Sequence, residues 1–112
     1  MGVVKQAEST PQVIAQRRTR YLAYTDNLMM AVIDFNDGPT SQPDPPHSHP
    51  HQQISYVASG EINFFLDNEP VRLGPGDMFT VPSNVPHAVQ LLSEYVRLID
   101  TFTPIRDEFL NL

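Results

Sequence analysis

The stretch PPHSHPHQQISYVASGE, residues 45–61, carries three of the four histidines of the chain at alternate positions. In an extended strand, side chains two residues apart point to the same face and lie about 7 Å apart along the chain. His47 and His49 can therefore converge on one ion, with Ser48 turned away. Neutral imidazole is a common ligand of zinc, nickel, copper and iron, so this pair is a candidate metal site.

Two residues outside the pair strengthen this interpretation. Gln53 shares the parity of the histidines and brings a neutral carbonyl oxygen to the same side. His87 follows the rigid Pro86, and a strand that begins at His87 could pair with the His47 segment and deliver a third nitrogen. A lone histidine pair is often only a surface feature, but the glutamine and the distant histidine favour metal binding. The predicted ligands are His47, His49, Gln53 and His87.

Prolines and glycines divide the rest of the chain into short segments. The eleven prolines and five glycines are spread along the chain as punctuation. Between them lie apolar or alternating runs typical of strands, at residues 28–35, 54–67, 71–82 and 87–102. Many short strands at close spacing indicate an all-β sandwich or barrel. The only helical candidates are weak, one near residues 10–18 and a single turn near the C-terminus.

Composition and charge restrict the class of protein. The chain has 112 residues, which suits one domain with its own core, and it has no cysteine. The absence of cysteine excludes disulfides and thiolate metal sites, and it suits a reducing cytoplasm, where we expect the protein. The net charge of −6 argues against a nucleic-acid partner, and RRTR, residues 17–20, is expected to be a solvated surface turn. No apolar run approaches the length of a membrane span, so no membrane partner is expected.

Two spaced motifs carry a family resemblance. Residues 47–60 read His, one residue, His, three residues, Gln, six residues, Gly, and residues 76–87 read Gly, five residues, Pro, four residues, His. These resemble the two cupin motifs, of which the first usually has Glu at the Gln53 position and the second Gly at the Asn84 position. Asn tolerates a left-handed turn well, so the second departure is mild. The chain is therefore similar to the small single-domain cupins.

This resemblance implies an all-β cupin jelly-roll barrel, a double-stranded β-helix, with a metal ion inside its mouth. It implies a homodimer, for which the apolar run at residues 28–35 is the only hint of an interface. His51 has no place in the family pattern, and Pro50 should bend the strand, so we expect His51 at the rim of the site. The expected organisation is a single cupin domain over 1–112, with an N-terminal arm or strand at 1–20, cupin motifs at 38–90 and a C-terminal tail at 104–112.

The neutral Gln53 bears on the chemistry of the ion. Three histidines and a glutamine leave a divalent ion its full charge, which makes it a stronger Lewis acid but holds it less tightly. Such a site suits binding and polarising an anionic hydroxy or keto acid. It suits manganese redox chemistry less well, because an anionic ligand helps to stabilise the oxidised metal. The expected cofactor is one divalent transition metal ion, which is nickel, zinc, iron or manganese.

The last predicted strand offers a second group of candidates. Asp100 and Phe102 have the same parity, and an acid beside a phenyl ring in an apolar strand is unusual. Near the ion, Asp100 could act as a general acid or base, with its pKa set by the ion and by desolvation. Arg106, beyond the strand, could clamp a substrate carboxylate. The alternatives are a turn-facing or salt-bridged Asp100 at a strand end and a surface Arg106 that pairs with Asp107 or Glu108.

The spacing of Asp100, Phe102 and Arg106 sharpens the resemblance. It is similar to that of the pectin-degradation cupins that linearise unsaturated uronates, in which two His, a Gln and a third His hold the metal. In that group an Asp, a Phe and an Arg of the final strand complete the active site, so the resemblance assigns chemistry and substrate binding to these three residues. The implied reaction opens the ring of 4,5-unsaturated galacturonate or guluronate and ketonises it to the 5-keto-4-deoxy acid.

Two other functions stay open. One is a metal-dependent cupin dioxygenase, and the other is a non-catalytic cupin that binds a sugar or an effector. Tyr56 is expected to pack in the core, with the cavity wall as the alternative. The negative net charge gives no steering to an anionic sugar acid, so the local ion and Arg106 would have to attract it.

Overall fold

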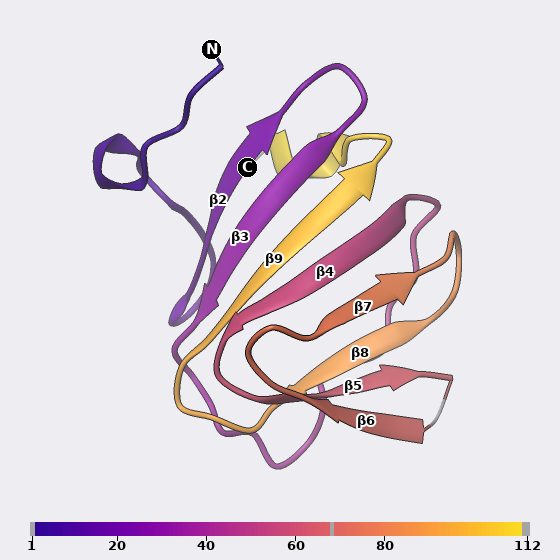
Figure 1. Cartoon of the computed structure of the whole chain (residues 1–112). Helices are drawn as coiled ribbons and strands as arrows, with labels where there is room; N and C mark the ends of the chain where they lie inside the picture. Colours follow the sequence, from indigo (N-terminus) through magenta and orange to yellow (C-terminus); the bar gives the residue numbers. More distant parts are fainter. Residues whose placement is uncertain (1, 68, 111–112) are drawn as a thin grey trace.

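Two antiparallel β-sheets enclose the core of the protein (Figure 1). A computed structural model of the chain describes residues 2–67 and 69–110. The nine strands in this part of the chain are β1 (Gln12–Ala15), β2 (Arg18–Tyr24), β3 (Met29–Phe35), β4 (Gln52–Ser59), β5 (Ile62–Leu66), β6 (Glu69–Leu73), β7 (Met78–Val81), β8 (His87–Leu91) and β9 (Val96–Thr103). The larger sheet has the strand order β1-β2-β3-β9-β4-β7, and the smaller sheet has the order β6-β5-β8.

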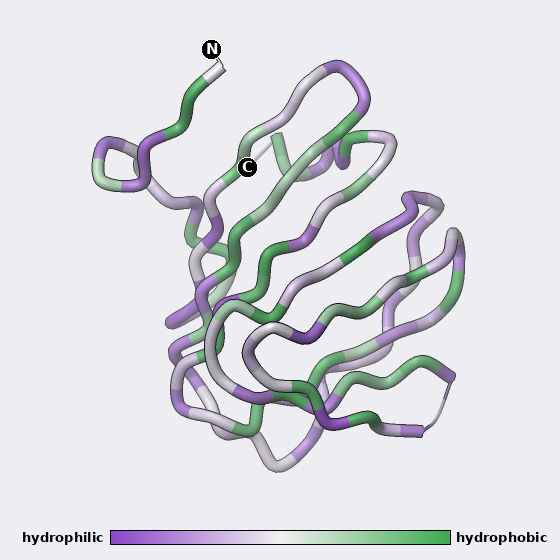
Figure 2. Tube along the Cα trace, in the orientation of Figure 1, coloured by the Kyte–Doolittle hydropathy of each residue, from purple (hydrophilic) through white to green (hydrophobic). Residues whose placement is uncertain are grey.

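The strands form where inward and outward side chains alternate. In β9, every second residue from Val96 to Phe102 is buried, and β3 alternates in the same way from Met29 to Phe35. Figure 2 shows the consequence, with hydrophobic residues concentrated along the strands and hydrophilic residues at many of the turns. The predicted all-β class and the predicted jelly-roll fold are confirmed.

Apolar side chains from both sheets meet in the core. The ring of Phe64, from β5, stacks on that of Phe79, from β7, with 4.0 Å between the ring centroids. Val57 and Ile62 are fully buried beside them. Burial of one such side chain stabilises the folded state by roughly 1.5–3 kcal/mol, so these contacts between the sheets hold the barrel closed.

Two turns require special backbone geometry. Gly60 has φ +80°, and a Cβ atom at this position would lie 2.3 Å from the carbonyl oxygen of Tyr95. Only glycine fits there, because the close approach excludes a Cβ atom and the left-handed conformation is unfavourable for most other residues. Asn84, where the second cupin motif usually has Gly, has φ 64°. The prediction that this Asn adopts a left-handed turn is therefore confirmed.

The helix predicted near residues 10–18 is wrong. The strand β1 occupies part of this range and pairs antiparallel with β2. The β-branched pair Val13 and Ile14 favours a strand, and the neighbouring edge of β2 supplies the hydrogen bonds. The short 3-10 helix η1 (Gln6–Glu8) lies before this strand, and the predicted C-terminal turn is present as the 3-10 helix η2 (Asp107–Leu110). No helix within residues 2–67 and 69–110 is long and apolar enough to cross a membrane.

The prediction that RRTR forms a solvated surface turn is also wrong for most of its length. Only Arg17 lies in the turn, with φ 65°. Arg18 begins β2 and forms ion pairs with Asp37 and Asp44, at 2.9 and 2.7 Å. Arg20 points into the barrel and is only 7% exposed. The sequence did not reveal this burial because Arg18 meets Asp37 and Asp44, and Arg20 meets Phe109, all in segments distant along the chain.

Candidate metal centre and catalytic cavity

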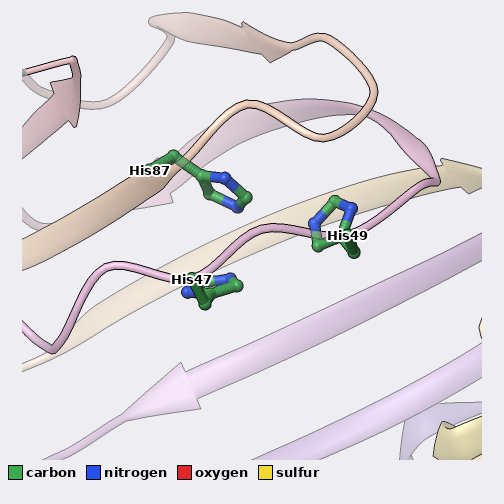
Figure 3. A group of neighbouring side chains, drawn as sticks. All are labelled: His47, His49 and His87. Atoms are coloured by element: carbon green, nitrogen blue, oxygen red, sulfur yellow. The ribbon is translucent and has the colours of Figure 1, made fainter.

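Three histidines lie together where the segment before β4 runs beside β8 (Figure 3). The backbones of His47 and His87 form an antiparallel bridge, with N–O distances of 3.0 and 2.9 Å. This is the pairing that the sequence predicted. The centroid of the His87 ring lies 4.2 Å from that of the His47 ring and 5.0 Å from that of the His49 ring. One nitrogen of each ring lies within 4.8 Å of the other two, so the three side chains could hold one ion.

Backbone carbonyl groups fix the tautomers of two of these rings. Nδ1 of His49 lies 2.9 Å from the carbonyl oxygen of His51, and Nδ1 of His87 lies 2.9 Å from that of Val85. A carbonyl oxygen can only accept, so each Nδ1 carries the hydrogen and donates it. In the neutral rings Nε2 is then a bare lone pair. Nε2 of His87 is buried and has no hydrogen-bond partner among the described residues, which leaves it free to bind a metal ion.

Gln53 adds an oxygen atom in an arrangement that a cation stabilises. Its Oε1 lies 3.0 Å from Nε2 of His49. Both atoms are acceptors when His49 is neutral with its hydrogen on Nδ1, so their lone pairs repel unless a proton or a cation lies beside them. Two ligand atoms about 2.1 Å from one ion, at right angles around it, are themselves about 3.0 Å apart. Together with Nε2 of His87, these atoms fit a divalent metal ion.

The surroundings keep the histidines neutral. His47 is exposed as a residue, but desolvation, together with repulsion from His87 and His49, lowers the pKa of His47 to about 4. Desolvation is also the main cause that lowers the pKa of His49 and of His87. The positive charge of Arg106 acts in the same direction on all three. At neutral pH the rings are therefore unprotonated, which is the state that binds metal.

Asp100 is buried on the inward face of β9, and Ser55 links it to Gln53 through two hydrogen bonds. It lies opposite Ser55 in the pairing of β4 with β9, and its Oδ1 accepts a hydrogen bond from Ser55 Oγ at 2.6 Å. Desolvation raises the pKa of Asp100 to about 6, while the Ser55 hydrogen bond and Arg106 oppose the rise. No ion pair to Asp100 occurs within the described part of the chain, so the alternative of a salt-bridged acid is wrong. A carboxyl group that titrates near neutrality can both accept and donate a proton.

Most of these groups line one cavity. Its polar lining comes from Asp44, His47, Gln53, His87, Asp100 and Arg106. Phe102 also lines it, and the ring of Phe102 lies edge-on to His49 with 5.9 Å between the centroids. The guanidinium carbon of Arg106 lies 5.2 Å from the centre of the Phe102 ring, and Arg106 also pairs with Glu108 at 2.9 Å. Arg106 therefore lines the cavity and forms the predicted ion pair at the same time.

Comparison with known proteins agrees with this architecture. Residues 35–102 match the cupin domain family. The chain belongs to the cupin family. The pectin degradation protein KdgF of Dickeya dadantii is 36% identical to this cupin over 94 residues, which are 83% of this chain and 83% of that protein.

Two solved structures share the fold over nearly the whole chain. The structure of KdgF from Halomonas sp. has a TM-score of 0.84 and 33% identity, and the match covers 94% of this cupin and 96% of that chain. An RmlC-like cupin from Shewanella frigidimarina has a TM-score of 0.87 and 30% identity, with 97% and 96% covered. The predicted resemblance to cupins and to the pectin-degradation members among them is confirmed.

Two residues of the motif region play different parts in this cupin. His51 is outside the group of three candidate ligands, and its backbone carbonyl orients His49. Tyr56 is 42% exposed, so the prediction that it packs in the core or lines the cavity is wrong. The reason is strand alternation, because Tyr56 has the opposite parity from Gln53 and Ser55 and points outward from β4.

The sequence did not single out several residues in or next to the site. Asp44 lies on its wall, and Arg18 holds this carboxylate in place with N–O distances of 2.7 and 3.3 Å. Ser55 links Gln53 to Asp100. Asp44 lies in a proline-rich loop with no motif, but Ser55 carried a signal because it has the parity of Gln53 on the same predicted strand.

The C-terminal tail is fastened over the cavity by the first two strands. Nε2 of Gln12 donates to the carbonyl oxygen of Phe109 at 2.8 Å, and Nε of Arg20 donates to Gln12 Oε1 at 2.8 Å. The guanidinium carbon of Arg20 lies 3.6 Å from the centre of the Phe109 ring, and that of Arg106 lies 4.3 Å from it. This cluster, which we call the tail clamp (Gln12, Arg20 and Phe109), sets the position of Arg106 at the cavity.

Proposed function

We propose that this cupin is a metal-dependent enzyme that linearises 4,5-unsaturated uronates of the galacturonate or guluronate type. The observation that carries the proposal is a group of three histidines and one glutamine, of which His47, Gln53 and His87 line the same cavity as the buried acid Asp100. The likeness to two KdgF proteins, of which one is named for pectin degradation, supports the class of substrate. The cofactor is one divalent transition metal ion, and His47, His49, Gln53 and His87 would hold it.

The proposed reaction is an isomerisation, in which no atom is gained or lost. The bond between C1 and the ring oxygen breaks, and the C1 hydroxyl loses its proton and becomes an aldehyde. The former ring oxygen is then the oxygen of an enolate at C5. When C4 takes up a proton, this enolate becomes the ketone. The site therefore has to hold a carboxylate, remove one proton and return one.

The residues of the cavity are suited to these tasks. Arg106 binds the substrate carboxylate through its planar guanidinium group. Phe102 packs against the face of the sugar and excludes water from it. Asp100 accepts the proton of the C1 hydroxyl and delivers a proton to C4, which a pKa of about 6 allows near neutral pH. A divalent ion in the site supplies a Lewis acid for the oxygens of the substrate.

Ultraviolet spectroscopy of an unsaturated uronate tests the proposal. The metal-loaded protein should remove the absorbance of the conjugated double bond faster than the spontaneous reaction does. Asp100→Ala and His87→Ala should abolish this activity, whereas Asp26→Ala, at an exposed acid outside the cavity, should leave it unchanged. A rate no faster than the spontaneous one for the metal-loaded protein would contradict the proposal.

The same assay separates the two other functions. A dioxygenase consumes oxygen, so undiminished turnover of the uronate under anaerobic conditions would exclude that function. A non-catalytic binding protein would bind the uronate without changing its absorbance, and Asp100→Ala would then have no activity to remove. The neutral Gln53 favours Lewis-acid chemistry over redox chemistry, because it leaves the charge of the ion uncompensated.

We also propose that the cupin is a homodimer and is cytoplasmic. Exposed apolar side chains on the outer face of the larger sheet support the dimer: Met30, Ile54, Tyr56 and Met78 are 44, 55, 42 and 65% exposed. Ile54 and Met30 both pair with Thr101 of β9, and Tyr56 pairs with Met78, so these side chains form one patch across four strands. Ile54→Glu should convert a dimer to a monomer in size-exclusion chromatography with light scattering. A monomeric parent protein would contradict this part of the proposal.

A further inference from the structure

Ser55 is a buried hydroxyl in the barrel wall that the proposed reaction leaves without a role. It is 1% exposed and lies on the inward face of β4, two residues after Gln53. A buried hydroxyl costs free energy unless it is hydrogen-bonded. Ser55 has two such partners, since its Oγ lies 2.6 Å from Asp100 Oδ1 and 2.9 Å from Gln53 Nε2. The hydroxyl therefore connects the buried acid to the candidate metal ligand.

The single proton of this hydroxyl gives the connection a direction. A carboxylate can only accept, so Ser55 donates its one proton to Asp100. Toward Gln53, the same oxygen can then only accept, and it takes a hydrogen from the amide nitrogen. Because the two ends of an amide are chemically opposite, the nitrogen facing Ser55 places Oε1 of Gln53 on the other side, 3.0 Å from Nε2 of His49.

Without Ser55, the opposite orientation of the amide would be preferred in the metal-free protein. A Gln53 amide rotated by half a turn would aim its nitrogen at the bare Nε2 of His49 and donate a hydrogen bond to it. That contact would occupy two candidate ligand atoms at once. In the observed orientation, two acceptors face each other at the His49 side, and the hydrogen bond to Ser55 offsets this unfavourable contact.

We propose that Ser55 is a positioning residue for the metal site, which fixes the Gln53 amide so that its carbonyl oxygen faces the ion. The Asp100 carboxylate contributes to this orientation, because it takes the only proton of the Ser55 hydroxyl and so leaves the Ser55 oxygen to accept from the Gln53 nitrogen. The inference rests on the metal site of the proposed function, but it does not depend on the identity of the substrate. Ser55 is thus needed for metal affinity although it does not touch the ion.

The affinity for Co²⁺, measured by titration without any sugar, tests this inference. Ser55→Ala should weaken Co²⁺ binding by about 10–100-fold, as expected when a group that orients a metal ligand is removed. The matched pair Ser55→Thr and Ser55→Val compares almost identical shapes with and without a hydroxyl. The Thr variant should bind Co²⁺ at least about 10-fold more tightly than the Val variant, and this comparison stands even where the Ala variant folds poorly.

A second background separates positioning from a general structural effect. In Gln53→Glu the side chain ends in two oxygens, so either orientation presents an oxygen to the ion. Ser55→Ala should therefore change Co²⁺ affinity by less than about 3-fold in that background. An equal loss in both backgrounds, or a Ser55→Ala affinity within about 2-fold of the parent, would overturn the inference. A parent protein that binds Co²⁺ tightly but leaves uronates unchanged would contradict only the proposed function.

Discussion

Replacement of Asp100 by Asn should make the metal-free protein more stable, and the gain should grow with pH. The Asn side chain has nearly the shape of the protonated acid, and its Oδ1 can still accept the hydrogen bond from Ser55. It carries no charge, so it avoids the desolvation that raises the pKa of Asp100 to about 6 from its ordinary value of 3.8. The substitution therefore isolates the free energy of burying this carboxylate.

The size of this gain in stability follows from the pKa of Asp100 in the folded chain, about 6, and in the unfolded chain, 3.8. Below pH 3.8 the acid is protonated in the folded and the unfolded chain and contributes no pH dependence. Between the two values the unfolded chain loses the proton first, so the free energy of unfolding falls as pH rises and levels off above pH 6. At about 1.36 kcal/mol for each pH unit between the two values, the loss at pH 8 is about 3 kcal/mol. At about pH 4.5 the same calculation gives a loss of about 1 kcal/mol.

Urea unfolding of both proteins in a chelating buffer measures this difference. The advantage of Asp100→Asn should increase by about 2 kcal/mol between about pH 4.5 and about pH 8. The other titrating groups are shared by the two proteins and cancel in the comparison. An advantage that is the same at both pH values, or a parent protein that is the more stable one at about pH 8, would refute the reasoning. The same variant should have no uronate activity, because the proposed reaction needs this carboxylate to accept and donate a proton.

Three further substitutions test other parts of the structure. His87→Ala should weaken Co²⁺ binding by at least about 100-fold and should abolish the rise in unfolding temperature that the ion causes in the parent protein. Gly60→Ala should lower the free energy of unfolding by at least about 2 kcal/mol, which is more than Gly76→Ala should. Both glycines have positive φ, but a Cβ atom at residue 60 would lie 2.3 Å from the carbonyl oxygen of Tyr95, whereas one at residue 76 would meet no atom within 4 Å. Urea unfolding of the two glycine variants checks this order. Arg20→Ala should speed hydrogen exchange in the C-terminal tail and raise the KM for the uronate. The Co²⁺ affinity of this variant should stay within about 2-fold of the parent. Unchanged hydrogen exchange would show that the tail clamp does not hold the tail.

The sequence was informative wherever the relevant spacing lies within one strand or within the segment that leads directly into it. His47, His49 and Gln53 share a parity, and so do Asp100 and Phe102, so strand alternation alone placed each group on one face. Alternation also places Tyr56 on the outer face, although its aromatic ring by itself favours burial. The left-handed turn at the Asn of the second motif followed from side-chain chemistry.

Features that depend on the pairing of distant strands were beyond the reach of the sequence. Ser55 meets Asp100 only because β4 pairs with β9 in one register, and nothing local to either segment fixes that register. Arg20 is buried because Phe109 reaches it from the opposite end of the chain. A charged residue in a short strand predicts exposure on its own, so its burial had to come from the tertiary structure.

Because the backbones of His47 and His87 form a bridge, a metal ion bound to both side chains would also affect the stability of the barrel. The two residues belong to different parts of the barrel, one to the segment that leads into the larger sheet and the other to the first position of β8 in the smaller sheet. An ion held by both side chains therefore ties together two sheets that are otherwise joined here by two backbone hydrogen bonds. By mass action, a free ion concentration of about 100 times its dissociation constant would stabilise the closed barrel by about 2.7 kcal/mol. The metal would thus stabilise the folded barrel as well as complete the site.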